Sequence, residues 1–160
     1  MLLPRPRIER TRSGEIRLRL PAGEREVLRD LPRQLRELLD AGDGDLVRLF
    51  PPAYPDDPEG NAEYERLVHG ELLAGKRRAL AIVEETLDAD RLDEEQLAAW
   101  VGALNDLRLV LGTRLDVTEE TYAAPPDPRD PRAPELALFA YLTWLQEQAV
   151  QALGSSLPPG

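Results

Sequence analysis

The fold of this chain is decided by residues 93–116, DEEQLAAWVGALNDLRLVLGTRLD. The stretch opens with the signals of a helix start, because Asp93 can cap the helix and Gln96 can complete a capping box. Leu92 and Leu97 flank this start at the spacing of a hydrophobic staple. The apolar residues that follow spread over most of the helix circumference, which is typical of a helix covered on most sides. We therefore predict a central, largely buried helix here.

Four polar side chains interrupt this apolar helix: Asn105, Asp106, Arg108 and Arg114. An unpaired charge is costly to bury, so these groups need partners on neighbouring elements or on a ligand. Gly112 lies one turn beyond Arg108 on the same face. Two interpretations stay open, a structural polar network and a small binding site.

Three further stretches have helical spacing, and together with the central helix they predict a mostly α-helical protein with a four-helix core. They cover about residues 23–41, 58–87 and 134–153. Pro32 lies inside the first stretch, so we expect a kink or a break there. Residues 116–131 contain several prolines and are expected to form a long loop.

The N-terminus predicts a small β-hairpin over about residues 5–20. Ile16, Leu18 and Leu20 alternate with arginines in the period-two pattern of a half-buried strand, and a Ser-Gly pair before them supplies a turn. Two strands alone are only marginally stable, so the hairpin must pack on the helices. Its polar positions are rich in arginine, namely Arg5, Arg7, Arg10, Arg12, Arg17 and Arg19.

Charge is divided unevenly along the chain. The formal net charge is −10, but residues 1–36 hold ten arginines and five acidic residues, so this segment is +5 and the remainder is −15. The arginines can bind phosphate or carboxylate groups through their planar guanidinium. They can equally pack on the acidic body or prevent unwanted strand pairing.

A proline-rich segment, residues 48–59, contains the aromatic residues Phe50 and Tyr54. Its prolines restrict the backbone, so we expect a stiff segment. The two rings can be buried against the core, or they can form a docking surface together with the hairpin arginines.

Composition limits the class of protein. The chain of 160 residues fits one domain, which we place at 1–154, with 155–160 as a frayed tail. It has no cysteine, which excludes disulfides, thiol nucleophiles and thiolate metal sites within the chain. His69 is the only histidine, so we expect neither a zinc site nor a catalytic triad. The longest strongly apolar stretch, 136–145, is too short to span a membrane, and we expect a cytoplasmic protein without cofactors.

Three phrases carry a resemblance to a known family: RLFPPAYPDDPEGNAEY at 48–64, ALNDLRLVLGTRLDV at 103–117 and YLTWLQEQ at 141–148. In this order and spacing, the chain resembles the actinobacterial family known only as domain of unknown function two thousand and seventeen. The resemblance covers essentially the whole chain and implies no established enzyme activity, cofactor or catalytic residue. It implies a gene position beside a ClpS-type adaptor of the Clp protease and near sulfur-metabolism genes. The resemblance also implies a role in transcriptional control under oxidative stress, which has been suggested for a relative that contains cysteine. This chain has no cysteine, so a disulfide switch cannot be transferred to it.

Two hypotheses about function follow. The first is a non-enzymatic protein-interaction or regulatory module with an unknown protein partner, linked to the stress response, Clp-dependent proteolysis or sigma-factor control. The alternative is a DNA-binding transcriptional regulator whose hairpin arginines contact phosphates or bases, although the net negative charge does not favour nucleic acid. An enzyme of unrecognised type is the third and least favoured option. Carboxylates such as Glu71, Glu84 and Glu85 are plentiful, but none belongs to a recognisable catalytic arrangement. A homodimer that forms by contact between the last helices of two copies is compatible with each of these three options.

Overall fold

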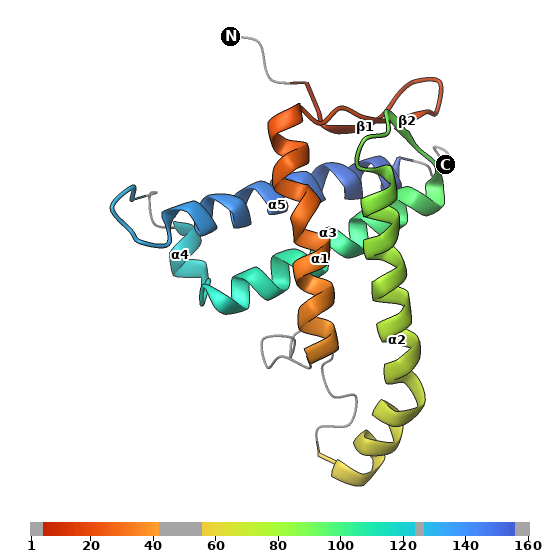
Figure 1. Cartoon of the computed structure of the whole chain (residues 1–160), viewed down its shortest axis with the longest axis vertical. Coiled ribbons are helices and arrows are strands. Elements are labelled where there is room, and N and C mark those ends of the chain that lie inside the picture. Colours follow the sequence, from red (N-terminus) through yellow and green to blue (C-terminus); the bar gives the residue numbers. More distant parts are fainter. Residues whose placement is uncertain (1–4, 42–55, 124–126, 156–160) are drawn as a thin grey trace.

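The computed structural model of the chain describes residues 5–41, 56–123 and 127–155 (Figure 1). Two short strands come first, β1 (Ile8–Arg10) and β2 (Ile16–Leu18). They are followed by α1 (Ala22–Ala41), α2 (Pro58–Thr86), β3 (Arg91–Leu92), α3 (Glu94–Arg114), α4 (Glu119–Ala123) and α5 (Ala133–Gly154). The predicted mostly α-helical fold, with a four-helix core and a small N-terminal hairpin, is confirmed.

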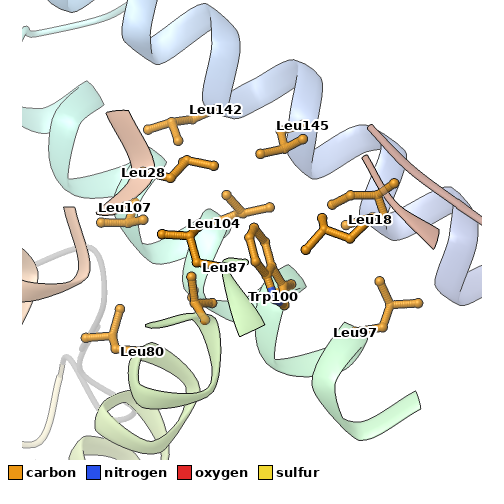
Figure 2. Packing of buried hydrophobic residues seen from close by; sticks show 14 of the residues in the cluster. Leu18, Leu28, Leu80, Leu87, Leu97, Trp100, Leu104, Leu107, Leu142 and Leu145 are labelled. Carbon is orange, nitrogen blue, oxygen red and sulfur yellow. The ribbon is translucent and has the colours of Figure 1, made fainter. Parts of the chain in front are cut away.

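The four long helices form two pairs that cross each other. Figure 1 shows α1 and α2 running across α3 and α5, with the small sheet over one end of the arrangement. α3 contacts α1, α2 and α5, so the predicted central helix lies in the middle of the fold. Leucines from these helices and from β2 converge around Trp100, whose side chain is fully buried (Figure 2). The Trp100 indole N–H donates to Thr86 Oγ1 at 2.8 Å, so its polar atom is satisfied inside the core.

Local sequence signals place the start of α3. Asp93 Oδ1 accepts a hydrogen bond from the backbone N–H of Gln96 at 2.7 Å. Gln96 Oε1 accepts one in return from the backbone N–H of Asp93 at 2.9 Å. This reciprocal pair is the predicted capping box.

A tight turn ends α3 and folds the chain back toward it. Asp116 adopts a φ of 52°, in the left-handed region. Its backbone N–H bonds to Thr113 O at 3.2 Å, and the N–H of Val117 bonds to Gly112 O at 2.9 Å. These two bonds form a Schellman motif, which normally has glycine at the left-handed position.

The hairpin belongs to a three-stranded antiparallel sheet in the order β1-β2-β3. β3 was not predicted, because a strand of two residues shows no recognisable period in the sequence. Its Leu92 pairs with Ile16, and both side chains are buried together with Ile8 and Leu18. The sheet therefore presents an apolar face to the helices, which is the support that an isolated hairpin lacks.

Of the two outcomes expected at Pro32, a kink or a break, the break was wrong. α1 is one helix, and Pro32 is buried on its packed face together with Leu28, Leu35 and Leu39. Leucines on both sides of the proline pack into the same core. This packing outweighs the backbone hydrogen bond that the proline cannot donate.

The expectation of an unbroken loop over residues 116–131 was also wrong, because the segment contains α4. Thr118 Oγ1 accepts a hydrogen bond from the backbone N–H of Thr121 at 3.3 Å, which caps this short helix. The prolines further along the segment obscured this signal. Of the predicted frayed tail, 155–160, only Ser155 is described, and its backbone N–H bonds to Gln151 O at the end of α5.

Candidate functional site

Asp106, one of the four polar residues of α3, is bound to α2. Lys76 Nζ lies 3.1 Å from each carboxylate oxygen of Asp106. Asp106 is only 6% exposed, and this burial raises the pKa of its carboxyl group although the lysine charge acts in the opposite direction. The two side chains form a largely buried link between α2 and α3.

Asn105 and Arg108 lie on the side of α3 that packs against α5. Asn105 Oδ1 accepts a hydrogen bond from Gln146 Nε2 at 3.1 Å and a long one from Arg108 Nη2 at 3.4 Å. Arg114 is exposed in the last turn of α3, where the helix dipole favours a cation. The structure therefore brings Asn105 and Arg108 together, but Asp106 is bound to α2 instead, so the four predicted residues do not form one cluster.

A small cavity lies beside Arg108, where α3 ends and α5 begins. Its volume is about 360 Å³, and Gly112, Thr118 and Phe139 contribute to its lining. A Cβ atom on Gly112 would lie only 3.0 Å from Phe139 Cε2, so the glycine allows the ring to approach the helix backbone. The sequence placed Arg108 and Gly112 on one face, but it carried no signal for Phe139 or Thr118 beside them.

Most hairpin arginines proposed for docking have acidic partners. The ion pairs join Arg10 to Glu94, Arg17 to Glu15 and Arg19 to Glu9. Arg5 and Arg12 are exposed, and neither has an ion pair within the described parts of the chain. Phe50 and Tyr54 lie outside the described residues. This pairing neutralises much of the positive charge that a phosphate-binding surface needs.

Arg7 also has an acidic partner, Glu24, and takes part in a partly buried cluster. Its Nε and Nη2 donate to Glu24 Oε1 at 3.0 Å and to Oε2 at 2.8 Å, and Tyr141 Oη donates to Oε1 at 2.7 Å. Burial alone would raise the pKa of Glu24, but the hydrogen bonds from Arg7 and Tyr141 outweigh it and lower this pKa overall. Burial, followed by the hydrogen bond to Glu24, raises the pKa of Tyr141. The cluster ties the hairpin to α1 and α5.

A groove of about 530 Å³ runs between β1 and α5. Trp144 stands at its side with 37% of its surface exposed, and the Arg7 guanidinium carbon lies 5.4 Å from the centre of its ring. Gln148 Oε1 accepts hydrogen bonds from the backbone N–H groups of Arg7 at 2.6 Å and Ile8 at 3.2 Å. These bonds cover the open edge of β1. The groove is lined by Pro6, Glu9, Trp144, Gln148, Gln151 and Ser155 among others.

This groove was not among the sites predicted from the sequence. Its available signal was the position of Tyr141 and Trp144 beside the apolar stripe of the last helix, where aromatic residues are not needed for the core. Gln148 had no signal, because the backbone groups that it binds are 140 and 141 positions away in the sequence.

Within residues 5–41, 56–123 and 127–155, no group of three or more His, Asp or Glu side chains is placed to hold a metal ion. In the same ranges, no helix combines the length and the apolar character needed to cross a membrane.

Comparison with known proteins identifies relatives in mycobacteria. The chain is 32% identical over 132 residues to the oxidative stress regulator AosR of Mycobacterium tuberculosis (strain ATCC 25618 / H37Rv) and to that of Mycobacterium bovis, covering 72% of this chain and 60% of each relative. It is 33% identical over 128 residues to the AosR protein of Mycobacterium leprae, covering 69% of this chain and 58% of that protein. The chain thus spans about three fifths of the length of these relatives. No solved structure matches it.

One family also matches almost the whole chain. It is described as Domain of unknown function (DUF2017), and the match covers residues 5–153. This range includes the hairpin, α1, α2, α3 and all but the last residue of α5. It also includes every residue that lines the cavity beside Arg108, and all that line the groove except Ser155. The chain therefore belongs to the DUF2017 family.

Proposed function

We propose that this chain is a non-enzymatic regulatory protein of the oxidative stress response, and that it acts by binding a protein partner in the groove between β1 and α5. The regulatory part rests on the mycobacterial relatives that carry the name oxidative stress regulator. Because this chain has no cysteine, its own thiols cannot sense the oxidant. Regulation through a bound partner fits this composition.

The exposure of Trp144 is the observation that carries the docking site. Tryptophan is enriched among the residues that contribute most to protein interfaces. The ring contacts both Arg7 and Tyr141, and the ring centre of Tyr141 lies 6.0 Å from that of Trp144. A side chain that is already ordered loses little conformational entropy on binding, so Trp144 is suited to anchor a partner.

The net charge of the chain favours a partner segment that is basic. The groove itself is lined by one acid and one base, Glu9 and Arg10, and Glu147 is exposed on α5 close to Trp144 in sequence. The whole chain carries a formal charge of −10, which would steer a basic partner toward it. We therefore propose a basic protein segment with an apolar residue that packs on Trp144.

Tagged capture from the native host, with nuclease treatment and mass spectrometry, tests this proposal when three forms of the chain are compared. Wild type and Val27→Ala should recover the same protein, since Val27 is 48% exposed on α1 and does not line the groove. Trp144→Ala should recover it about tenfold less or worse, as expected for an interface anchor. The purified partner should bind more weakly as ionic strength rises. Equal recovery by Trp144→Ala and wild type would contradict the proposed groove.

Genetics tests the regulatory part separately. A deletion strain should lose survival and its transcript response under oxidant, and complementation with Trp144→Ala should restore less than wild type. An unchanged response in the deletion strain would contradict a regulatory role. Recovery of a ClpS-type adaptor in the capture would support the finer link to Clp-dependent proteolysis.

DNA binding by the hairpin stays the alternative, and its support is Arg5 and Arg12, which are exposed and have no ion pair in the described ranges. A duplex titration distinguishes it. Salt-sensitive association that weakens in an Arg5→Ala/Arg12→Ala variant would favour this alternative. If the chain does not associate with the duplex at low ionic strength, the DNA-binding alternative is excluded.

A further inference from the structure

The cavity beside Arg108 has the features of a ligand site that the proposed function does not use. It lies between the C-terminal half of α3, the segment 117–119 and the first turns of α5. Its volume of about 360 Å³ is at the lower end of the range for pockets that bind small molecules. Its walls are mainly apolar and include Leu109, Val117 and Phe139.

Arg108 brings a charge into this apolar cavity without the hydrogen bonds that a guanidinium normally makes. Its Nε is buried and has no hydrogen-bond partner within the described residues. Its one hydrogen bond there is the contact of 3.4 Å to Asn105, whose oxygen also accepts from Gln146. A guanidinium has five N–H donors, and buried donors are rarely left unpaired in native proteins. A group that enters the cavity can supply the missing acceptor.

A carboxylate of opposite sign lines the same cavity. Glu119 is among the lining residues and is exposed, so its carboxylate is accessible to a ligand that enters the cavity. Within the described residues, Arg108 and Glu119 form no ion pair with each other. The lining of the cavity thus combines an incompletely satisfied cation, an accessible anion and apolar surface.

The backbone around the cavity is held in place by contacts that do not depend on a ligand. The Schellman motif at Asp116 fixes the direction in which residues 117–119 leave α3. On the opposite wall, Phe139 packs directly against Gly112. A preformed cavity of this kind binds a ligand without a large ordering cost.

From this arrangement we propose that the cavity binds a free α-amino acid with an apolar side chain. The carboxylate of the ligand binds the Arg108 guanidinium, and its ammonium group binds Glu119. The apolar side chain lies against Leu109, Val117 and Phe139. A simple anion would leave Glu119 facing a second negative charge, whereas a zwitterion satisfies both groups of the protein.

Calorimetric titration of the full chain with L-leucine tests the proposal, with isocaproate and isoamylamine as probes. Each analogue keeps the apolar part of leucine, but isocaproate lacks the amino group and isoamylamine lacks the carboxylate. L-Leucine should bind, and both analogues should bind about tenfold more weakly or worse, because each loses a charge-assisted hydrogen bond. Equal affinity for leucine and either analogue would overturn the proposal, as would the absence of any heat of binding with leucine at millimolar concentration.

Three variants test which side chains bind the charged groups of leucine. Arg108→Gln and Glu119→Gln should each weaken leucine binding about tenfold or more. Glu120→Gln removes the neighbouring exposed carboxylate, which does not line the cavity, and should leave the affinity unchanged. Glu119 is exposed, so Glu119→Gln keeps the fold even if Arg108→Gln does not. Wild-type affinity in Glu119→Gln would refute the zwitterion. Because Trp144 lies outside this cavity, failure here is distinguishable from failure of the proposed docking groove.

Discussion

Lys76 on α2 and Asp106 on α3 form a two-oxygen ion pair, in which Nζ lies 3.1 Å from both Oδ1 and Oδ2. Their side chains are only 20% and 9% exposed. Burial opposes this pair, since it raises the pKa of Asp106 by favouring the neutral acid. The link therefore adds little net stability compared with apolar packing, but losing either partner alone is costly.

Removing only the lysine charge is expected to destabilise the fold. Lys76→Met leaves the Asp106 carboxylate buried without its counter-ion, which should lower the free energy of unfolding by about 3 kcal/mol. Urea denaturation followed by circular dichroism measures this change. The double variant Lys76→Met/Asp106→Leu should recover most of the loss, because it removes both charges.

Arg77→Met is the matched control for this prediction. Arg77 is the next residue on α2 and pairs with Asp40, but the two side chains are 43% and 57% exposed. An exposed pair of this kind contributes less than about 1 kcal/mol. Equal losses in Lys76→Met and Arg77→Met would show that the Lys76–Asp106 pair is no more important than a surface contact.

Glu24 should make the stability of the protein depend on pH in the acid range. The pKa of its carboxyl group is lower in the folded protein than the ordinary value of 4.5, because the hydrogen bonds from Arg7 and Tyr141 outweigh the effect of burial. Its stabilising contribution is therefore fully present above the unfolded-state pKa and is lost as pH falls through the folded-state pKa. The stability advantage of wild type over Glu24→Gln should shrink across this range, as measured by urea midpoints.

Two other acids serve to check this assignment. Glu26→Gln removes an exposed carboxylate from the same helix, whose partner Arg29 is also exposed, and serves as the matched control variant. Asp106 acts in the opposite sense, because its raised pKa means that protonation favours the folded state. An advantage of wild type over Glu24→Gln that stays constant into strong acid would contradict the prediction.

Asp116 should respond to substitution according to its backbone conformation. Its φ of 52° is unfavourable for residues with a Cβ atom, and most of all for β-branched ones. We expect Asp116→Gly to leave stability unchanged or raise it by up to about 1 kcal/mol, and Asp116→Val to lower it by about 1–3 kcal/mol. Thermal unfolding of both variants measures this. A valine variant as stable as the glycine variant would argue against the left-handed conformation.

Gln148 should protect the backbone of β1. Gln148→Leu leaves the N–H groups of Arg7 and Ile8 without their acceptor, at an expected cost of about 1–3 kcal/mol. Hydrogen exchange at the Ile8 amide should accelerate in this variant. Gln151→Leu, a change of the same type in the same groove, should not affect that amide. Unchanged exchange in Gln148→Leu would show that other contacts hold β1 in place.

Much of the fold could be predicted because its signals are local. The capping box of Asp93 and Gln96 spans one helical turn, and the alternation around Ile16 and Leu18 spans a few residues. Pro32 shows the limit of such signals, since a residue that disfavours helices is tolerated where leucines on both sides share one core. The short β3 was missed because it depends on its partner strand β2 more than on its own two residues. α4 was missed because the prolines that follow it obscured its local Thr118 cap.

The candidate sites could be predicted only in part. The sequence singled out Arg108 and the arginines around Arg7, since charges beside apolar residues need partners. It could not show that Arg7 pairs with Glu24 while Arg108 faces a cavity. That difference depends on side chains supplied by other elements, such as Tyr141 and Phe139.

The sequence by itself determined the helical class of this protein, its central helix and the presence of charged groups within that helix. These follow from periodicity and capping, which act over a few residues. Only the tertiary structure decided which of those charges are satisfied. Asp106 forms an ion pair with Lys76, and Asn105 accepts a hydrogen bond from Gln146. Arg108 makes one long hydrogen bond and lies beside an open cavity. The reason is physical: the free energy of a buried charge depends on which dipoles and charges surround it in three dimensions, and residues distant in sequence supply most of them.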